Sequence, residues 1–223
     1  MNYTQELYLC ALKPKGSFGL SDNIYALLSL SGILELLEGG FLIKDEKNRL
    51  SAKNNLGSDL PYLKSLYENI ISCKKPTKIE TIVSEYNDGF GKHVNAFLQD
   101  IGDSLAEQNA VSVETSKKIF GGTKNKYLPV QSSVTNVIEK IRAEILEDGT
   151  MSEETVVLAI LLQQANIIKD FFSKVESSKL KKRVEELRQS ETYKEIAKVI
   201  EYIESLLALV VLLPMLTSTT NSN

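Results

Sequence analysis

The segment Leu20–Lys44, LSDNIYALLSLSGILELLEGGFLIK, decides the fold of this chain. Between Ile24 and Leu37 almost every residue is apolar or small. A helix that is apolar on all sides has to lie in the interior of a protein. Its apolar part, about 14 residues long, is too short to span a bilayer, which takes about 20 residues. We therefore predict a buried central helix in a mainly α protein.

Both ends of this helix carry recognisable signals. Ser21 and Asp22 are residue types that accept the free N–H groups at a helix start. Gly39-Gly40 provides a residue for the left-handed conformation that closes a helix end. Beyond it, Phe41–Asp45 and Arg49–Lys53 flank three polar residues, which is typical of a short β-hairpin.

The composition is that of one ordinary globular domain. Hydrophobic residues make up 43% of the 223 residues and charged residues 25%. The net charge is −3, so any affinity for a polyanion has to come from a local patch. We find no linker, and predict a single compact helical domain over residues 1–215 with one or two short β-hairpins. Residues 216–223 are small and polar, and are predicted to form a disordered tail.

The chain carries no sign of export. Cys10 and Cys73 share no metal-binding spacing and are interpreted as thiols in a reducing compartment. Glu6 stands where a signal peptide needs apolar residues. The apolar run Leu206–Leu213 is followed by Pro214 and is too short to span a membrane. We expect a cytoplasmic protein that meets a membrane only from its surface.

Most of the remaining chain has helical periodicity. The segment Thr4–Leu12 fits either a short helix or a strand, whereas Val111–Ile119 and Lys126–Val130 are predicted to pair as a hairpin. A further helix is expected after Ser190. The other predicted helices are Pro61–Cys73, Thr77–Tyr86, Lys92–Gln108, Ser132–Gly149, Ser152–Phe172 and Lys179–Gln189.

Signs of catalysis are few. The motifs HExxH, GxSxG and GxxxxGK[ST] are all absent. The single histidine, His93, opens an amphipathic helix and is interpreted as a surface residue. Glu35 and Glu38 lie one turn apart; we expect one to cap a loop or pair with a lysine and the other to be solvated. We predict no catalytic residue, no metal and no cofactor.

Basic residues give a stronger signal than acidic ones. Between Thr115 and Pro129 four lysines and no acid occur, interleaved with aromatic and apolar residues. Such a hairpin can lie on an anionic membrane, since each lysine near the surface contributes about 1 kcal/mol and a buried Phe about 1.5–3 kcal/mol. The alternative is a solvated hairpin whose lysines only maintain solubility. The candidate contact residues are Lys117, Lys118, Phe120, Lys124, Lys126 and Tyr127.

The three helices and hairpin of residues 61–130 also resemble the outline of a winged-helix DNA-binding domain. In that class the third helix enters the major groove. Here that helix carries Lys92 against Asp100, Asp103 and Glu107, which is the wrong charge for a phosphate backbone. DNA binding is therefore kept only as a weaker alternative, and no nucleic acid partner is expected.

The succession of segments is similar to the Golgi phosphoprotein 3 family, which includes bacterial relatives. The likeness covers roughly Gln5–Leu213, and it is carried by the order of the segments rather than by any single motif. In chain order these segments are LYLCALK, ILELLEGGFLIKD, LGSDLPYLKSLYENI, SLAEQNAVSVE, a hairpin ending in Tyr127-Leu128-Pro129, VVLAILLQQANIIKDFF and LKKRVEEL.

This resemblance implies a compact helical domain from which a hairpin projects, contacting the membrane and mediating self-association. Family members bind phosphatidylinositol 4-phosphate and hold the cytosolic tails of glycosyltransferases at the Golgi. It thus implies three kinds of partner: an anionic membrane surface, membrane-protein tails and a second copy of the chain. The alternative from another class is a lipid-independent protein-interaction module.

The family's lipid pocket is not retained in this sequence. It uses a Trp and an Arg at the central helix and two Arg on the helix before the hairpin. An ungapped comparison places Leu20, Ser29, Asn95 and Leu98 at those positions. None of them can supply the charge-assisted hydrogen bonds of an arginine clamp. We therefore expect a degenerate headgroup pocket, and assign membrane contact to the hairpin.

Overall fold

The computed structural model describes residues 1–18, 23–87, 89–117, 123–146, 152–189, 194, 197–198, 201–206 and 208. The predicted signals at Ser21, Asp22, Gly149 and Ser190 and the tail 216–223 lie outside these residues. The helices and strands are α1 (Tyr3–Ala11), α2 (Ile24–Glu38), β1 (Leu42–Lys44), β2 (Arg49–Ala52), η1 (Pro61–Leu63), α3 (Lys64–Ser72), β3 (Thr77–Lys78), α4 (Ile79–Asn87), α5 (Lys92–Glu107), β4 (Val111–Lys117), β5 (Thr123–Pro129), α6 (Gln131–Ile141), η2 (Arg142–Leu146), α7 (Glu153–Gln164), η3 (Ile168–Asp170) and α8 (Lys174–Arg188). The protein is mainly α with two small antiparallel sheets, as predicted.

Helix α2 is the buried helix expected from the sequence. All its residues from Ile24 to Leu36 are buried except Tyr25. Its end is closed by Gly40, whose φ of +70° is left-handed. The Gly40 N–H donates to the Leu37 carbonyl at 3.0 Å and the Phe41 N–H to the Leu36 carbonyl at 2.9 Å, as in a Schellman motif.

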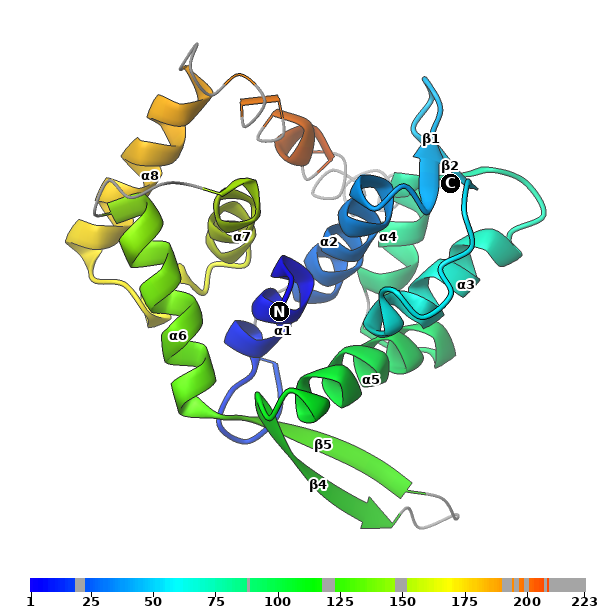
Figure 1. Ribbon diagram of the computed structural model, residues 1–223, viewed down its shortest axis with the longest axis horizontal. Coiled ribbons are helices and arrows are strands. Elements are labelled where there is room, and N and C mark those ends of the chain that lie inside the picture. Colours follow the sequence, from blue (N-terminus) through cyan, green and yellow to red (C-terminus); the bar gives the residue numbers. More distant parts are fainter. Residues whose placement is uncertain are drawn as a thin grey trace, which may run out of the picture.

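Helix α1 is equally central. The sequence pattern left this segment undecided between a helix and a strand. All nine of its residues are buried, including Thr4, Gln5 and Glu6. It packs against α2 and α7, and it also contacts α5 and α6 (Figure 1). The core of the protein is therefore built around two neighbouring helices rather than around α2 alone.

The other helices form two groups around this pair. Figure 1 shows α3, α4 and α5 on one side of α1 and α2, and α6, α7 and α8 on the other. The short sheet β1–β2–β3 follows α2, with Ile43 paired to Ser51 and Leu50 paired to Thr77. The β4–β5 hairpin projects away from the helices at the bottom of the view.

Several predicted boundaries were wrong. Thr77 and Lys78 begin no helix, because they pair with β2 as strand β3. Helix α7 ends at Gln164, since Asn166 adopts a left-handed φ of +56°. The apolar residues that follow still face the core, because the chain turns back against it; Ile167 and Phe172 are both buried there.

Helix α8 begins five residues earlier than predicted. Ser173 accepts a hydrogen bond from the Glu176 N–H at 3.2 Å, and the Glu176 side chain accepts one from the Ser173 N–H at 2.8 Å. This is a capping box, whose Ser-x-x-Glu spacing was visible in the sequence. Helix α6, in turn, ends at Ile141 and continues as the π-helical turn η2.

Candidate functional site

The candidate site is the β4–β5 hairpin with the surface at its base. The two strands pair without a break from Val111–Pro129 to Lys117–Thr123, so β5 begins three residues before the predicted strand. Residues 118–122, which include Lys118 and Phe120, lie outside the described residues. Two proposed contact residues therefore have no described position.

Tyr127 anchors the hairpin to the body. Only 7% of it is exposed, and its ring covers Gly102 of α5. Its hydroxyl donates to the Asp103 carboxylate at 2.7 Å. Burial and this hydrogen bond raise the pKa of Tyr127, so the hydroxyl stays protonated and keeps donating. We interpreted Tyr127 as a membrane-contact residue; its burial removes it from the exposed surface.

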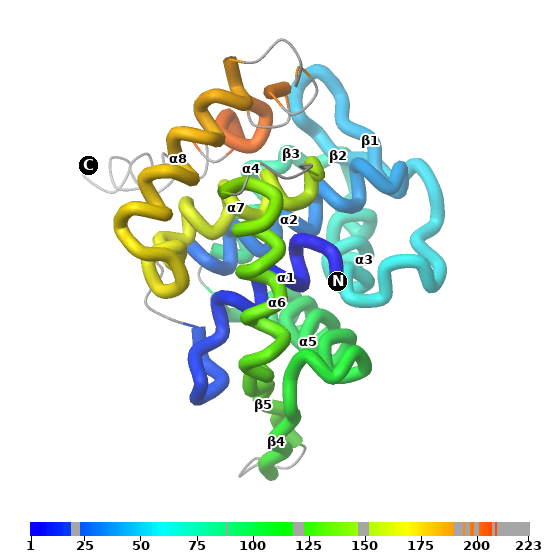
Figure 2. Tube along the Cα trace, turned by 60° about the vertical axis from the view of Figure 1, so that its left-hand side comes forward, coloured from blue at the N-terminus to red at the C-terminus, as the bar shows by residue number. Residues whose placement is uncertain are grey.

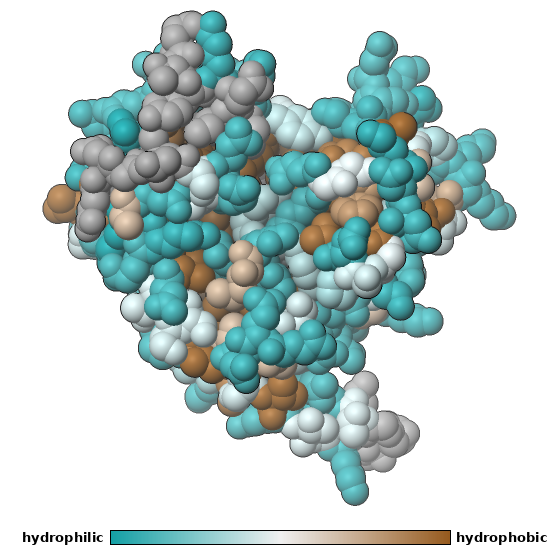
Figure 3. Space-filling model, in the orientation of Figure 1, coloured by the Kyte–Doolittle hydropathy of each residue, from teal (hydrophilic) through white to brown (hydrophobic). Residues whose placement is uncertain are grey.

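The strand register sorts the lysines onto two faces of the hairpin. Side chains of directly opposite residues share a face, and successive residues alternate. Lys124 and Lys126 therefore lie on one face, and Lys117 lies on the other together with Tyr127. Figure 3 shows the projecting hairpin in white and teal, with brown apolar residues near its junction with the body.

Glu114 offsets part of the positive charge of the hairpin. Glu114 is directly opposite Lys126, and their side chains form an ion pair of 3.4 Å that remains exposed. Such an exposed pair contributes at most about 1 kcal/mol to stability. Lys117 and Lys124 are exposed, and neither pairs with an acid among the described residues. They are the two described lysines that give the hairpin its net positive charge.

A loop from the N-terminal part of the chain lies against the hairpin base. Leu12 and Phe18 form a β-bridge that closes this loop. At Gly16, a Cβ atom would lie 2.6 Å from the Tyr127 carbonyl oxygen, so only glycine allows the loop to approach β5 this closely. Lys15 is exposed in this loop, whereas Lys13 is paired with Asp170 at 2.6 Å. Figure 2 shows this loop in blue near the hairpin, and its Lys15 adds an exposed cation there.

The four residues predicted to stand at the family's headgroup positions are uncharged. Ser29 is fully buried, and its hydroxyl donates to the Ala26 carbonyl at 2.9 Å. Asn95 is exposed and donates to the Gly91 carbonyl at 2.7 Å. Leu98 is partly buried against the core, and Leu20 lies outside the described residues. The three described residues thus have structural contacts and carry no charge.

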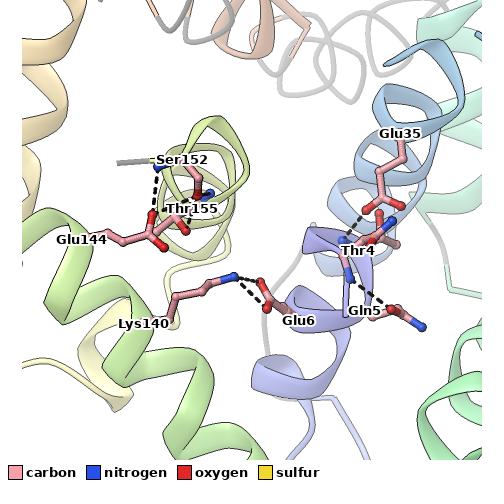
Figure 4. Close-up of polar contacts among 9 residues, drawn as sticks. Thr4, Gln5, Glu6, Glu35, Lys140, Glu144, Ser152 and Thr155 are labelled. Carbon is pink, nitrogen blue, oxygen red and sulfur yellow. Dashed lines mark hydrogen bonds and ion pairs between the residues drawn. The ribbon is translucent and has the colours of Figure 1, made fainter. Parts of the chain in front are cut away.

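The Glu35 carboxylate is a structural acceptor rather than part of a metal site. It lies in the interior, where it accepts the Thr4 N–H at 2.8 Å and the Tyr62 hydroxyl. Burial raises its pKa, and the hydrogen bonds from Tyr62 and Thr4 oppose this shift. The carboxylate therefore caps the N-terminus of α1 from a distant part of the chain (Figure 4). We predicted that one of the two glutamates caps a loop or pairs with a lysine; Glu35 instead caps the first turn of a helix, a target that spacing alone did not reveal.

Glu38, the second glutamate of this pair, accepts a hydrogen bond from the Tyr3 hydroxyl at 3.0 Å. Partial loss of water around the carboxyl raises the pKa of Glu38 to about 7, and the charges of Glu35, Glu154 and Glu153 act in the same direction. The prediction of an ordinary solvated carboxylate is therefore incomplete.

Two other polar residues of α1 each bind a different neighbouring helix. Gln5 donates to the Ser104 hydroxyl of α5 at 2.9 Å. Both carboxylate oxygens of Glu6 accept hydrogen bonds from the Lys140 ammonium group of α6, at 2.8 and 2.6 Å. Figure 4 shows Glu6 and Thr4 pointing to opposite sides of α1, towards α6 and α2. The sequence analysis missed these contacts, although three consecutive polar residues in an apolar segment are a signal.

The described parts of the chain hold no cluster of three or more His, Cys, Asp or Glu side chains that could bind a metal ion. Cys10 is buried, Cys73 is partly buried, and both are free thiols. His93 is exposed at the start of α5, as predicted.

Helix α5 packs on one side against neighbouring elements, and two of its acids take part in those contacts. It packs against α3, η1 and both strands of the hairpin. Asp100 accepts the Ser65 N–H at 2.8 Å, and Asp103 accepts the Tyr127 hydroxyl. Of the three acids that opposed the winged-helix interpretation, Asp100 and Asp103 are therefore partly buried hydrogen-bond acceptors, whereas Glu107 is exposed.

The fold and the hairpin together define a helical domain with a projecting, partly basic β-hairpin. No described helix is both long enough and apolar enough to cross a membrane. The family model for Golgi phosphoprotein 3 (GPP34) matches residues 4–203. The chain therefore belongs to the Golgi phosphoprotein 3 family, as the sequence resemblance suggested. A comparison with curated proteins found no match.

Proposed function

We propose that this protein associates with the cytoplasmic surface of a membrane through the β4–β5 hairpin, by charge rather than through a specific headgroup clamp. Its family is Golgi-associated and is not a family of enzymes. The observation that carries the proposal is the projecting hairpin, on which Lys117 and Lys124 are exposed and make no ion pair with a described acid. Lys15 is exposed in the loop whose Gly16 lies against Lys126 and Leu128, on the hairpin face that carries Lys124, and adds a cation on that side.

The hairpin also offers a surface for self-association. It is a two-stranded sheet, so each strand has an outer edge that no third strand pairs within the described parts of the chain. Such edges can pair with the same edge of a second copy. Membrane-bound copies would then present several hairpins to one surface, which strengthens binding by avidity. Tails of membrane proteins remain further partners implied by the family.

Flotation on vesicles tests the hairpin directly. We expect the wild-type chain to float with vesicles of phosphatidylcholine and phosphatidylserine, and to be released by salt. The Lys117→Glu, Lys124→Glu double variant is expected to bind roughly 30-fold more weakly, since each lysine contributes about 1 kcal/mol. A matched control is Lys174→Glu with Lys182→Glu, which changes the same charge on α8. Equal binding by both double variants would contradict the proposal.

Headgroup selectivity separates a charged surface from a clamp. We expect phosphatidylinositol 4-phosphate vesicles to bind the chain no better than phosphatidylserine vesicles of equal surface charge, because Ser29, Asn95 and Leu98 supply no cation. A clear preference for the phosphoinositide would show that other residues form a clamp. Absence of flotation on every vesicle, together with retention by a protein partner, would favour the lipid-independent interaction module.

A further inference from the structure

The turn between α4 and α5 exposes an aromatic ring to solvent. Phe90 is 82% exposed, more than any other large apolar side chain in the described ranges. The next most exposed is Val175 of α8, at 78%. Full burial of a Phe side chain contributes about 1.5–3 kcal/mol, which this protein does not recover by folding.

Glycines on both sides leave the Phe90 ring uncovered. Gly89 and Gly91 have φ values of +69° and +105°, conformations that other residues rarely adopt. Neither glycine has a side chain that could shield the neighbouring ring. The turn therefore exposes one aromatic side chain between two residues that have none.

The two glycines beside Phe90 are held by hydrogen bonds. The Gly89 N–H donates to the Tyr86 carbonyl at 3.1 Å, and the Gly91 carbonyl accepts from the Asn95 side chain at 2.7 Å. Gly89 also lies under the Tyr25 ring, so closely that a Cβ atom would be 2.3 Å from it. The ring of Phe90 is thus exposed on a pre-organised turn, which lowers the entropic cost of any contact it makes.

Contacts connect this turn to the proposed membrane surface. Gly89 touches Tyr25, whose ring meets Phe18 edge to face with centroids 5.5 Å apart. Phe18 ends the loop that packs through Gly16 on β5. A chain of contacts therefore links the turn to the loop that carries Lys15, and through Gly16 to the base of the hairpin.

We infer that Phe90 inserts into the interfacial region of a lipid bilayer and is a second membrane contact beside the hairpin. This inference rests on the proposed function. A bilayer accepts a single aromatic ring, whereas a stable protein partner needs an interface of about 1,200 Å² or more. Charge around the turn is mixed, since Glu85 and Lys92 are exposed and Asp88 stands two positions before Phe90 in the sequence, so the contribution of this contact comes from the apolar ring.

The experiment uses the absence of tryptophan from the whole chain. In the full-length Phe90→Trp variant, fluorescence reports this position alone. With vesicles of phosphatidylcholine and phosphatidylserine we expect a blue shift, and quenching when the lipids carry bromine on their acyl chains. The matched control is Val175→Trp, which places tryptophan at a comparably exposed site on α8 and is expected to show neither change. Its response to the same vesicles would contradict the proposed orientation.

A second variant measures the contribution of the ring. Phe90→Ser removes only exposed atoms, so its thermal unfolding should match that of wild type, and it should bind vesicles roughly tenfold or more weakly. If wild type floats but Phe90→Trp does not shift and Phe90→Ser binds normally, the insertion of Phe90 is wrong and the hairpin function stands. If wild type does not float at all, both proposals are wrong.

Discussion

At the scale of single residues, buried polar groups of this protein are stabilised by partners far away in sequence. Glu35 and Thr4 are separated by 31 positions, and Lys140 and Glu6 by 134. An ionised carboxylate is costly to bury unless it is hydrogen-bonded. The hydrogen bonds that Glu35 accepts from Thr4 and Tyr62 offset part of the free energy that its burial costs. These glutamates connect helices through hydrogen bonds.

The raised pKa of Glu38 makes stability depend on pH. Its folded value of about 7 exceeds the ordinary unfolded value of about 4.3, so the folded state retains a proton that the unfolded state releases. The stabilisation is therefore fully present below about pH 4.3 and is lost as the pH rises through about 7.

We expect Glu38→Gln to lack this pH-dependent component, while still accepting the Tyr3 hydrogen bond. Urea unfolding of the wild type and of the variant at about pH 5 and about pH 8 measures this pH-dependent stabilisation. The difference in the free energy of unfolding between wild type and variant should change by up to about 1 kcal/mol between the two pH values. Solvent around Glu38 screens the effect and keeps it this small. The same difference at both pH values would contradict this prediction.

At the scale of elements, the hairpin depends on one close contact with α5. A Cβ atom on Gly102 would lie 2.4 Å from the Tyr127 ring, a distance that real Cβ contacts do not reach. Alanine is favoured over glycine within a helix by about 1 kcal/mol. The clash is expected to outweigh this gain, since overpacking costs about 1–3 kcal/mol.

Gly102→Ala should therefore destabilise the protein by about 1 kcal/mol in thermal or urea unfolding. In a Tyr127→Ala background the same substitution should become neutral or stabilising, because the ring is gone and only helix propensity remains. Identical effects of Gly102→Ala in both backgrounds would show that Tyr127 does not set the position of the hairpin.

At the scale of the whole molecule, α1 connects the two helical groups. Its polar side chains reach α5 and α6, and its N-terminus is capped by α2. The contact to α6 is an ion pair between Glu6, whose side chain is 7% exposed, and Lys140, at 33%. Removing one partner of such a pair leaves a buried charge, which is far more costly than removing both.

Lys140→Met is accordingly expected to lower the free energy of unfolding by about 3 kcal/mol. The double variant Glu6→Leu with Lys140→Met should recover most of that loss, because the two apolar side chains can pack where the ion pair was. Urea unfolding measures both. A double variant as unstable as Lys140→Met alone would show that the pair is needed for more than charge compensation.

Much of the fold was predictable from local patterns. The apolar run of α2, the glycines at its end and the Ser152 cap of α7 were all recognised, and the structure confirms them. The errors have identifiable physical causes. At Thr77 a strand pairing replaced the first helical turn, and after Gln164 the chain turned while its apolar residues stayed in the core. In both places, contacts to distant residues outweighed the local pattern.

The sequence by itself determined that a fully apolar helix is buried and that a lysine-bearing hairpin follows α5, and it predicted the loss of the headgroup clamp. Residue type and spacing suffice for these conclusions. Only the tertiary structure decided that α1 shares the centre, that Tyr127 is an anchor, that Glu114 offsets Lys126 and that Phe90 is exposed. These depend on strand register and on contacts between residues far apart in the chain, which local sequence patterns do not contain.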